Sequence, residues 1–217
     1  MESSGGHGFE HNLHGLVTEL VRMLSLVRHG ANLAQRALIG RDASAAEECA
    51  RNEEQVDALM EDLERQVITI IARHQPTAKD LRFLGAVYRS LADVERAGDY
   101  ALHVARVGAE LSASEPIKKY VDLDRILTVI DEMIERTMKA LSESDAEAAR
   151  EALAMDDEID VLEQQIQREL LTLMMEDPRH VGPGMMLIST TRYLERLGDH
   201  LENVNEHLIF WLTGERL

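Results

Sequence analysis

An internal repeat constrains the fold of this chain more than any other feature of its sequence. A shift of 103 positions aligns one stretch with another without a gap, and it superposes identical residues: Asp42, Ala43, Ala45, Ala46, Glu48 and Asp57 on Asp145, Ala146, Ala148, Ala149, Glu151 and Asp160. A shift of 100 then places Glu95-Arg96 and Gly98-Asp99 on Glu195-Arg196 and Gly198-Asp199. A fixed period of this length indicates two copies of one structural unit.

Each copy carries apolar residues at the spacing of amphipathic helices, as in Leu16, Leu20, Leu24 and Val27. Aromatic residues make up only 4% of the chain, which disfavours a sheet-rich fold. We therefore predict an all-α protein: a tandem repeat of two three-helix up-down bundles, six helices in all. The first repeat is expected over residues 10–112 and the second over residues 117–213.

Turn signals divide each repeat into its helices. Turns are expected near residues 40, 76, 115, 143 and 180, and the prediction places all four prolines in connections. Ser44 followed by Glu47 predicts a capping box at the start of one helix. A single helix is expected from Ser144-Asp145 to Asp177-Pro178, and the last helix from about residue 184.

Charge and cysteine content exclude several classes of protein. The chain has 40 acidic and 23 basic residues, a formal net charge of -17, which would repel nucleic acid and argues against a free phosphate pocket. A cation or a basic protein surface is the expected ligand. Cys49, the only cysteine, indicates a reducing compartment. Without an apolar run of 18 residues or a signal peptide, we expect a cytoplasmic protein with no direct membrane insertion.

Paired carboxylates recur in both repeats at a spacing of four residues, which puts both acids on one face of a helix. In two helices joined by a turn, residues equidistant from the turn lie level. The sequence midpoint between Glu53 and Asp99 is Pro76, and so is the midpoint between the other two acids of that repeat. In the second repeat, the midpoint of each pairing falls between residues 177 and 178. The two predicted sets are Glu53, Asp57, Glu95 and Asp99, and Asp156, Asp160, Glu195 and Asp199.

Four carboxylates brought together at a bundle edge repel one another unless a cation compensates. Oxygen ligands suit hard ions, so each set is predicted to bind divalent or ferric ions such as Fe, Mn or Mg. His103 could add one nitrogen ligand. The alternative is a solvated acidic face neutralised by Arg96, Arg192 and Arg196. Metal binding is favoured because the set of four acids occurs in both repeats, with the same arrangement about the turn.

Two segments strongly resemble the paired signatures of the PhoU family: Leu91-Ala92-Asp93-Val94-Glu95-Arg96-Ala97-Gly98-Asp99 and Tyr193-Leu194-Glu195-Arg196-Leu197-Gly198-Asp199-His200. The resemblance covers essentially the whole chain. It implies two three-helix bundles, multinuclear metal sites on their surfaces, and a homodimer. It also implies control of phosphate uptake and of phosphate-starvation signalling, through the ATPase subunit of the phosphate ABC transporter and the phosphate sensor histidine kinase.

Two other classes of protein share some of these features. A diiron-carboxylate enzyme also clusters acids on antiparallel helices, but its Glu-x-x-His pairs are missing here and its carboxylates would face a buried cavity. A metal-free helical adaptor would use the acids only for solvation. Since no catalytic nucleophile, acid/base pair or phosphate loop is visible, we expect a regulator that is not an enzyme.

Overall fold

The computed structural model describes residues 4–215 as long helices joined by short turns. No strand occurs in this range, and non-helical breaks lie close to the five predicted turns, so the all-α prediction is confirmed. The elements are α1 (Ser4–Leu38), α2 (Ala45–His74), α3 (Ala78–Leu111), α4 (Val121–Glu143), α5 (Ala146–Ala154), α6 (Asp156–Glu176), η1 (Pro178–His180) and α7 (Val181–Thr213).

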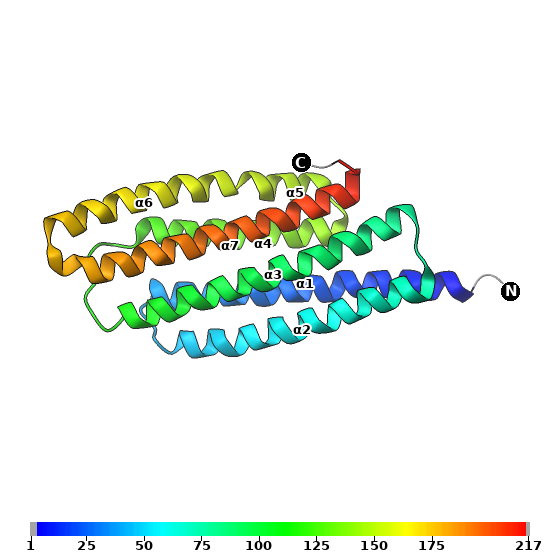
Figure 1. Ribbon diagram of the computed structural model, residues 1–217, viewed down its shortest axis with the longest axis horizontal. Helices are drawn as coiled ribbons and strands as arrows, with labels where there is room; N and C mark the ends of the chain where they lie inside the picture. Colours follow the sequence, from blue (N-terminus) through cyan, green and yellow to red (C-terminus); the bar gives the residue numbers. More distant parts are fainter. Residues whose placement is uncertain (1–3, 216–217) are drawn as a thin grey trace.

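The helices form one elongated bundle (Figure 1). The four helices α1, α3, α4 and α7 occupy its middle, while α2 lies along one outer side and α5 with α6 along the other. Two of these outer helices are each one arm of a hairpin: α2 with α3, and α6 with α7. The predicted acidic residues lie on these two hairpins.

Residues at equivalent positions of the two repeats meet each other, which shows that an approximate twofold axis relates the repeats. The Arg28 guanidinium donates two hydrogen bonds of 2.7 Å to the carboxylate of Asp131, its equivalent 103 positions later. The Tyr100 ring stacks on His200, its equivalent 100 positions later, at 5.7 Å between ring centroids. Helix α1 therefore pairs with α4, and α3 with α7, in antiparallel fashion.

The apolar stripes predicted from the sequence form the core. Leu16, Leu20, Leu24 and Val27 are fully buried, and they belong to a cluster of buried side chains that continues through both repeats. Burying one such aliphatic side chain contributes about 1.5–3 kcal/mol before the cost of chain ordering. The predicted tandem of two three-helix bundles is confirmed, and the two repeats share one core.

Four local predictions are wrong in detail. Ser44 makes no capping hydrogen bond through its side chain; instead its backbone N–H and hydroxyl both donate to Asp42 Oδ1, at 3.1 Å and 2.6 Å. Pro183 lies inside α7 rather than in a connection, within the first turn, where a missing N–H costs little. Helix α1 begins at Ser4, whereas the apolar stripe predicts a helix from about Leu13 to Leu38. The single helix expected after Asp145 is broken at Met155 into α5 and α6.

None of the described helices combines the length and the apolar character needed to cross a membrane.

Candidate metal centres

The two hairpins bring acids from different helices to the same level. Helix α2 ends at His74, and Gln75 adopts a left-handed conformation that reverses the chain into α3. Helix α6 ends at Glu176, and Asp177 caps the following turn by accepting the Arg179 backbone N–H at 2.9 Å. These turns fix the register in which α2 faces α3 and α6 faces α7.

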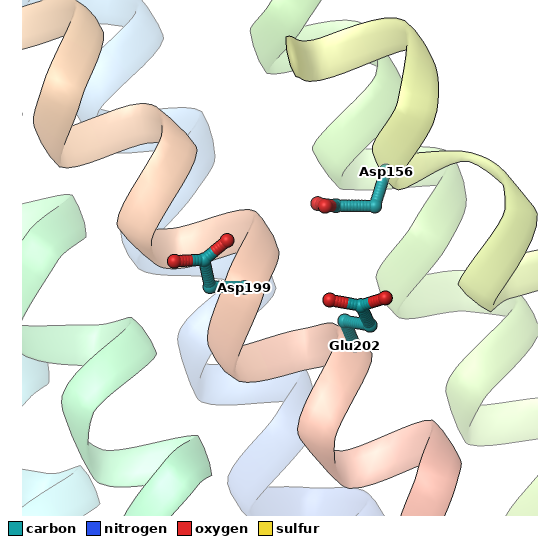
Figure 2. A group of neighbouring side chains, drawn as sticks. All are labelled: Asp156, Asp199 and Glu202. Atoms are coloured by element: carbon teal, nitrogen blue, oxygen red, sulfur yellow. The ribbon is translucent and has the colours of Figure 1, made fainter. Parts of the chain in front are cut away.

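In the α6–α7 hairpin, three carboxylates converge: Asp156, Asp199 and Glu202 each offer an oxygen within 4.8 Å of the others. Figure 2 shows Asp156 extending from the start of α6 toward the other two side chains, which project from α7. We call these three residues the acid trio. Asp156 is buried, with 8% of its surface exposed, and the other two are half-buried.

The break at Met155 determines where Asp156 lies. The Met155 N–H bonds to Ala152 O and the Glu158 N–H to Met155 O, both over three residues and both at 3.2 Å, so the helix tightens into a turn there. The tightened turn starts α6 at Asp156, which approaches α7 so closely that a Cβ on Gly198 would lie 2.5 Å from Asp156 Oδ1. The glycine at position 198 leaves the space on α7 that the Asp156 carboxylate occupies.

Asp156 Oδ1 is buried and accepts no hydrogen bond from any described residue. Burial, followed by the charges of Glu202, Asp160 and Asp199, raises the pKa of Asp156 to about 7. Burial and the Glu206 and Asp199 charges raise the pKa of Glu202. An unpaired buried oxygen facing two further carboxylates costs free energy unless a cation or a proton occupies the space between them.

The other two predicted ligands of this repeat flank the trio without joining it. Asp160 is exposed on α6, one turn after Asp156. Glu195 is half-buried on α7, and burial and the Asp199 charge raise its pKa. Arg196 approaches Asp199 at 3.0 Å and Glu195 at 3.5 Å, so part of the negative charge is already paired, as the solvated-face alternative predicted.

In the α2–α3 hairpin the predicted acids come together more loosely. Burial and the charges of Asp57 and Asp99 raise the pKa of Glu53 to about 7, and a hydrogen bond to Asp99 contributes. Glu95 is half-buried and Asp57 is exposed. Within residues 4–215, no three side chains of this hairpin place ligand atoms within 4.8 Å of one another.

Two residues change the set predicted from the sequence. Glu202 was missed, although it lies three residues after Asp199 and therefore on the same helix face. Its equivalent in the first repeat is Leu102, so comparison of the repeats pointed away from it. His103, a predicted extra ligand, instead places its ring 5.1 Å from that of Tyr193, at the contact between α3 and α7.

The donor set fits a hard cation. All three groups of the acid trio are carboxylates, which are the ligands that Mg, Mn, Ca and ferric ions prefer. Histidine ligands of the kind used by diiron enzymes are missing from the trio, and the nearest histidine in sequence, His200, bonds through Nδ1 to Asp93 Oδ1 at 2.9 Å. The site therefore belongs to the class of oxygen-only carboxylate clusters on helical hairpins.

Comparison with known proteins identifies the family of the chain. The PhoU domain model matches the chain twice, at residues 20–107 and 123–208, and the chain belongs to the PhoU family. A Deinococcus radiodurans protein named "Phosphate-specific transport system accessory protein PhoU homolog" is 42% identical over 95% of this chain and 97% of its own length. The crystal structure of PhoU from Pseudomonas aeruginosa covers 95% of this chain and 100% of its own, with a TM-score of 0.92 and 32% identity.

Proposed function

We propose that this protein is a regulator of phosphate uptake that holds phosphate-starvation signalling off when phosphate is plentiful. It would act in the cytoplasm by binding the ATPase subunit of a phosphate ABC transporter, the associated sensor histidine kinase, or both. Support comes from family membership over both repeats and from the Deinococcus radiodurans relative, whose name describes an accessory protein of a phosphate-specific transport system.

The second part of the proposal is that the two acidic hairpins bind metal ions. Asp156, Asp199 and Glu202 would hold an ion in the second repeat, with Asp160 and Glu195 beside it. Glu53, Asp57, Glu95 and Asp99 would form the site of the first repeat. The observation that carries this proposal is the buried, unpartnered Oδ1 of Asp156 facing two further carboxylates. A bound cation would supply positive charge that neutralises these groups and ties α6 to α7.

A role by contact is consistent with the charge of the protein. A surface at a net charge of -17 attracts basic patches of a partner within roughly a Debye length, about 8 Å at physiological salt. Metal at the acidic hairpins would cancel part of that charge locally. Metal occupancy could then control how strongly these faces attract a basic partner.

Metal content of the purified protein tests the sites directly. The Asp99→Ala, Asp199→Ala double variant should lose bound divalent or ferric ions, as measured by elemental analysis. A matched control is the Glu64→Ala, Glu176→Ala double variant, which removes the same charge from α2 and α6 outside both acid sets. Unchanged metal content in the first variant, or equal loss in the control, contradicts the proposed sites.

A deletion strain tests the regulatory role. Loss of the gene should switch on a starvation-inducible reporter in abundant phosphate, and the wild-type gene should silence it again. A reporter that stays silent in the deletion strain rules out the repressive role. Full complementation by the Asp99→Ala, Asp199→Ala variant would leave that role intact and show that the metal sites do not serve it.

The family resemblance also led us to expect a homodimer. Sedimentation equilibrium of the purified chain should give about twice the mass of one chain. The mass of a single chain at all accessible concentrations would contradict this part of the proposal.

A further inference from the structure

A groove between α1 and α2 differs from the rest of this acidic molecule in charge. It encloses about 400 Å³ near the end of α2, and His11 on α1 faces Arg65, Arg73 and His74 on α2 across it. None of the side chains that line it is a carboxylate. In a chain with 17 more acids than bases, a groove lined by two arginines and two histidines is a local reversal of charge.

The arginines of this groove are available to a ligand. Several arginines of the chain are held in ion pairs, such as Arg28 with Asp131 at 2.7 Å. Among the described residues, by contrast, Arg73 has no ion pair or hydrogen bond. Arg65 has only a 3.3 Å contact with Asp62, three residues before it on the same exposed helix face. Exposed pairs of this kind are weak, so a bound anion would compete with Asp62 successfully.

Gly15 leaves the α1 wall of the groove open. A Cβ built at this position would meet no atom within 4 Å, so the groove extends over the glycine backbone. Gln66 and Asn12 border the same space. Gln66 Nε2 donates to Asp62 Oδ2 at 2.7 Å and Asn12 Nδ2 lies 3.5 Å from His74 Nε2, and each amide has a second N–H for a ligand. Guanidinium and amide N–H groups together are the donors that recognise oxyanions.

We propose that this groove binds a compact phosphate anion, either inorganic phosphate or a short condensed form of it. Arginine binds phosphate oxygens in pairs, which gives the site its preference. Ile70 is the only aliphatic side chain in the lining, and the other side chains there carry polar or charged groups. A groove of this volume has room for more than one phosphate group.

The negative net charge of the chain does not prevent an anion from binding in this groove. The repulsion expected from the overall charge acts over about 8 Å at physiological salt, so the arginines at the groove determine the local field. The inference stands apart from the proposed regulatory function, because it rests on α1 and α2 residues that belong to neither acid set.

Isothermal titration of the full chain with inorganic phosphate, tripolyphosphate and ATP tests the proposal. Titrations before and after removal of metal by a chelator separate this site from phosphate bound through a metal. We expect saturable binding of phosphate or tripolyphosphate in both preparations, and no gain in affinity for ATP over tripolyphosphate. Absence of saturable binding at millimolar anion, or tighter binding of ATP, overturns the proposal.

Four variants locate the site. Arg73→Gln should weaken binding about tenfold, the loss expected for one charge-assisted contact at an exposed site. Arg51→Gln, an exposed arginine of the same helix outside the groove, is the matched control and should leave affinity unchanged. Gly15→Leu should block the groove without altering charge, and Asp62→Asn should strengthen binding by releasing Arg65. Equal weakening by Arg73→Gln and Arg51→Gln would show non-specific attraction and end the proposal.

Discussion

The α6–α7 hairpin and the α2–α3 hairpin carry pairs of acids at equivalent positions, but within residues 4–215 only the α6–α7 hairpin brings three carboxylates within 4.8 Å of one another. Two differences account for this. Glu202 supplies a third carboxylate where the first repeat has the buried Leu102, and the break at Met155 starts α6 at Asp156. In the first repeat α2 runs unbroken past the equivalent residue, Glu53.

The comparison shows that a shared motif defines a helix face, while the residues around it decide how closely its members meet. Gly98 and Gly198 occupy the same position of the motif. A Cβ on Gly98 would meet Val56 Cγ1 at 3.5 Å, an ordinary contact, whereas one on Gly198 would meet the Asp156 carboxylate. The same glycine therefore borders an apolar contact in one repeat and a candidate metal ligand in the other.

Exchanging the residue that differs should give the largest effect. Glu202→Leu should weaken metal binding in the second repeat by about a hundredfold or more, because it removes a direct ligand. Leu102→Glu should destabilise the metal-free protein by about 3 kcal/mol, since it buries a carboxylate among others. Added metal should recover part of that loss. Denaturant unfolding with and without chelator measures both.

The control for this exchange is Leu102→Gln, which has similar size but no charge. If metal stabilises Leu102→Gln as much as Leu102→Glu, the recovered stability does not come from a new carboxylate ligand. Unchanged metal affinity in Glu202→Leu would remove Glu202 from the proposed site.

Alanine at the two glycines should have opposite effects. Gly198→Ala should destabilise the protein by about 1–3 kcal/mol and lower its metal affinity, because Asp156 Oδ1 and Ile159 Cδ1 lie 2.5 Å and 3.0 Å from the new Cβ. Gly98→Ala should stabilise it by about 0.5–1 kcal/mol through helix propensity alone. Thermal unfolding compares the two variants. Equal effects of the same sign would contradict the difference in packing around Gly98 and Gly198.

The pH dependence of the metal-free protein should reveal both acid sets. The pKa of Glu53 and that of Asp156 are raised to about 7, against about 4 in an unfolded chain. Between these values the folded state binds more protons than the unfolded state, so stability falls as pH rises from about 4 to about 7. We expect a loss on the order of 1–2 kcal/mol from each group.

Substitutions assign this loss to the two repeats. Asp156→Asn and Glu53→Gln should each flatten part of the decline, measured by urea unfolding between pH 5 and pH 8 in the presence of chelator. Saturating metal should reverse the trend, because it binds the ionised carboxylates. If the fall in stability with pH persists unchanged in the Glu53→Gln, Asp156→Asn double variant, it comes from other groups.

Much of the fold follows from the sequence because its causes are local or periodic. The apolar stripes and turn residues predict the helices. The shift of 103 makes Arg28 and Asp131 equivalent positions, but it does not predict that they meet. The shared core was missed, since helix periodicity shows which face is apolar and not which partner covers it. The break at Met155 was missed as well, because no proline or glycine marks it.

The candidate site was only partly predictable for related reasons. Each of Asp156 and Asp199 was identified because it has another acid four residues away. Their equal distance from the turn predicted that they lie level, and the structure brings them together. The burial of Asp156 depends on the turn at Met155 and on the open space at Gly198, which are tertiary features. Glu202 was detectable by helix spacing, but the argument from repetition favoured residues that both repeats share.

The smallest predicted difference lies where the repeats meet, between α3 and α7. Asp93 accepts one hydrogen bond from Asn203 Nδ2 at 3.2 Å and lies against the imidazoles of His200 and His207 at 2.9 Å and 3.4 Å. Burial opposes its ionisation, but the contacts with the two histidines and Asn203 prevail and lower the pKa of Asp93 to about 2. Its equivalent in the second repeat is Tyr193, whose ring packs on Tyr100 and His103.

Asp93→Asn should therefore destabilise the protein by about 1 kcal/mol at neutral pH, while Tyr193→Phe should change stability by less than about 0.5 kcal/mol. A lowered pKa means that the carboxylate contributes fully above about pH 4 and loses its contribution as pH falls toward about 2. Urea unfolding at pH 7 compares the variants with the wild type. A neutral or stabilising Asp93→Asn would show that the cost of burying this charge outweighs its three contacts. The contact between α3 and α7 would then depend on the ring packing of Tyr193 with Tyr100 and His103.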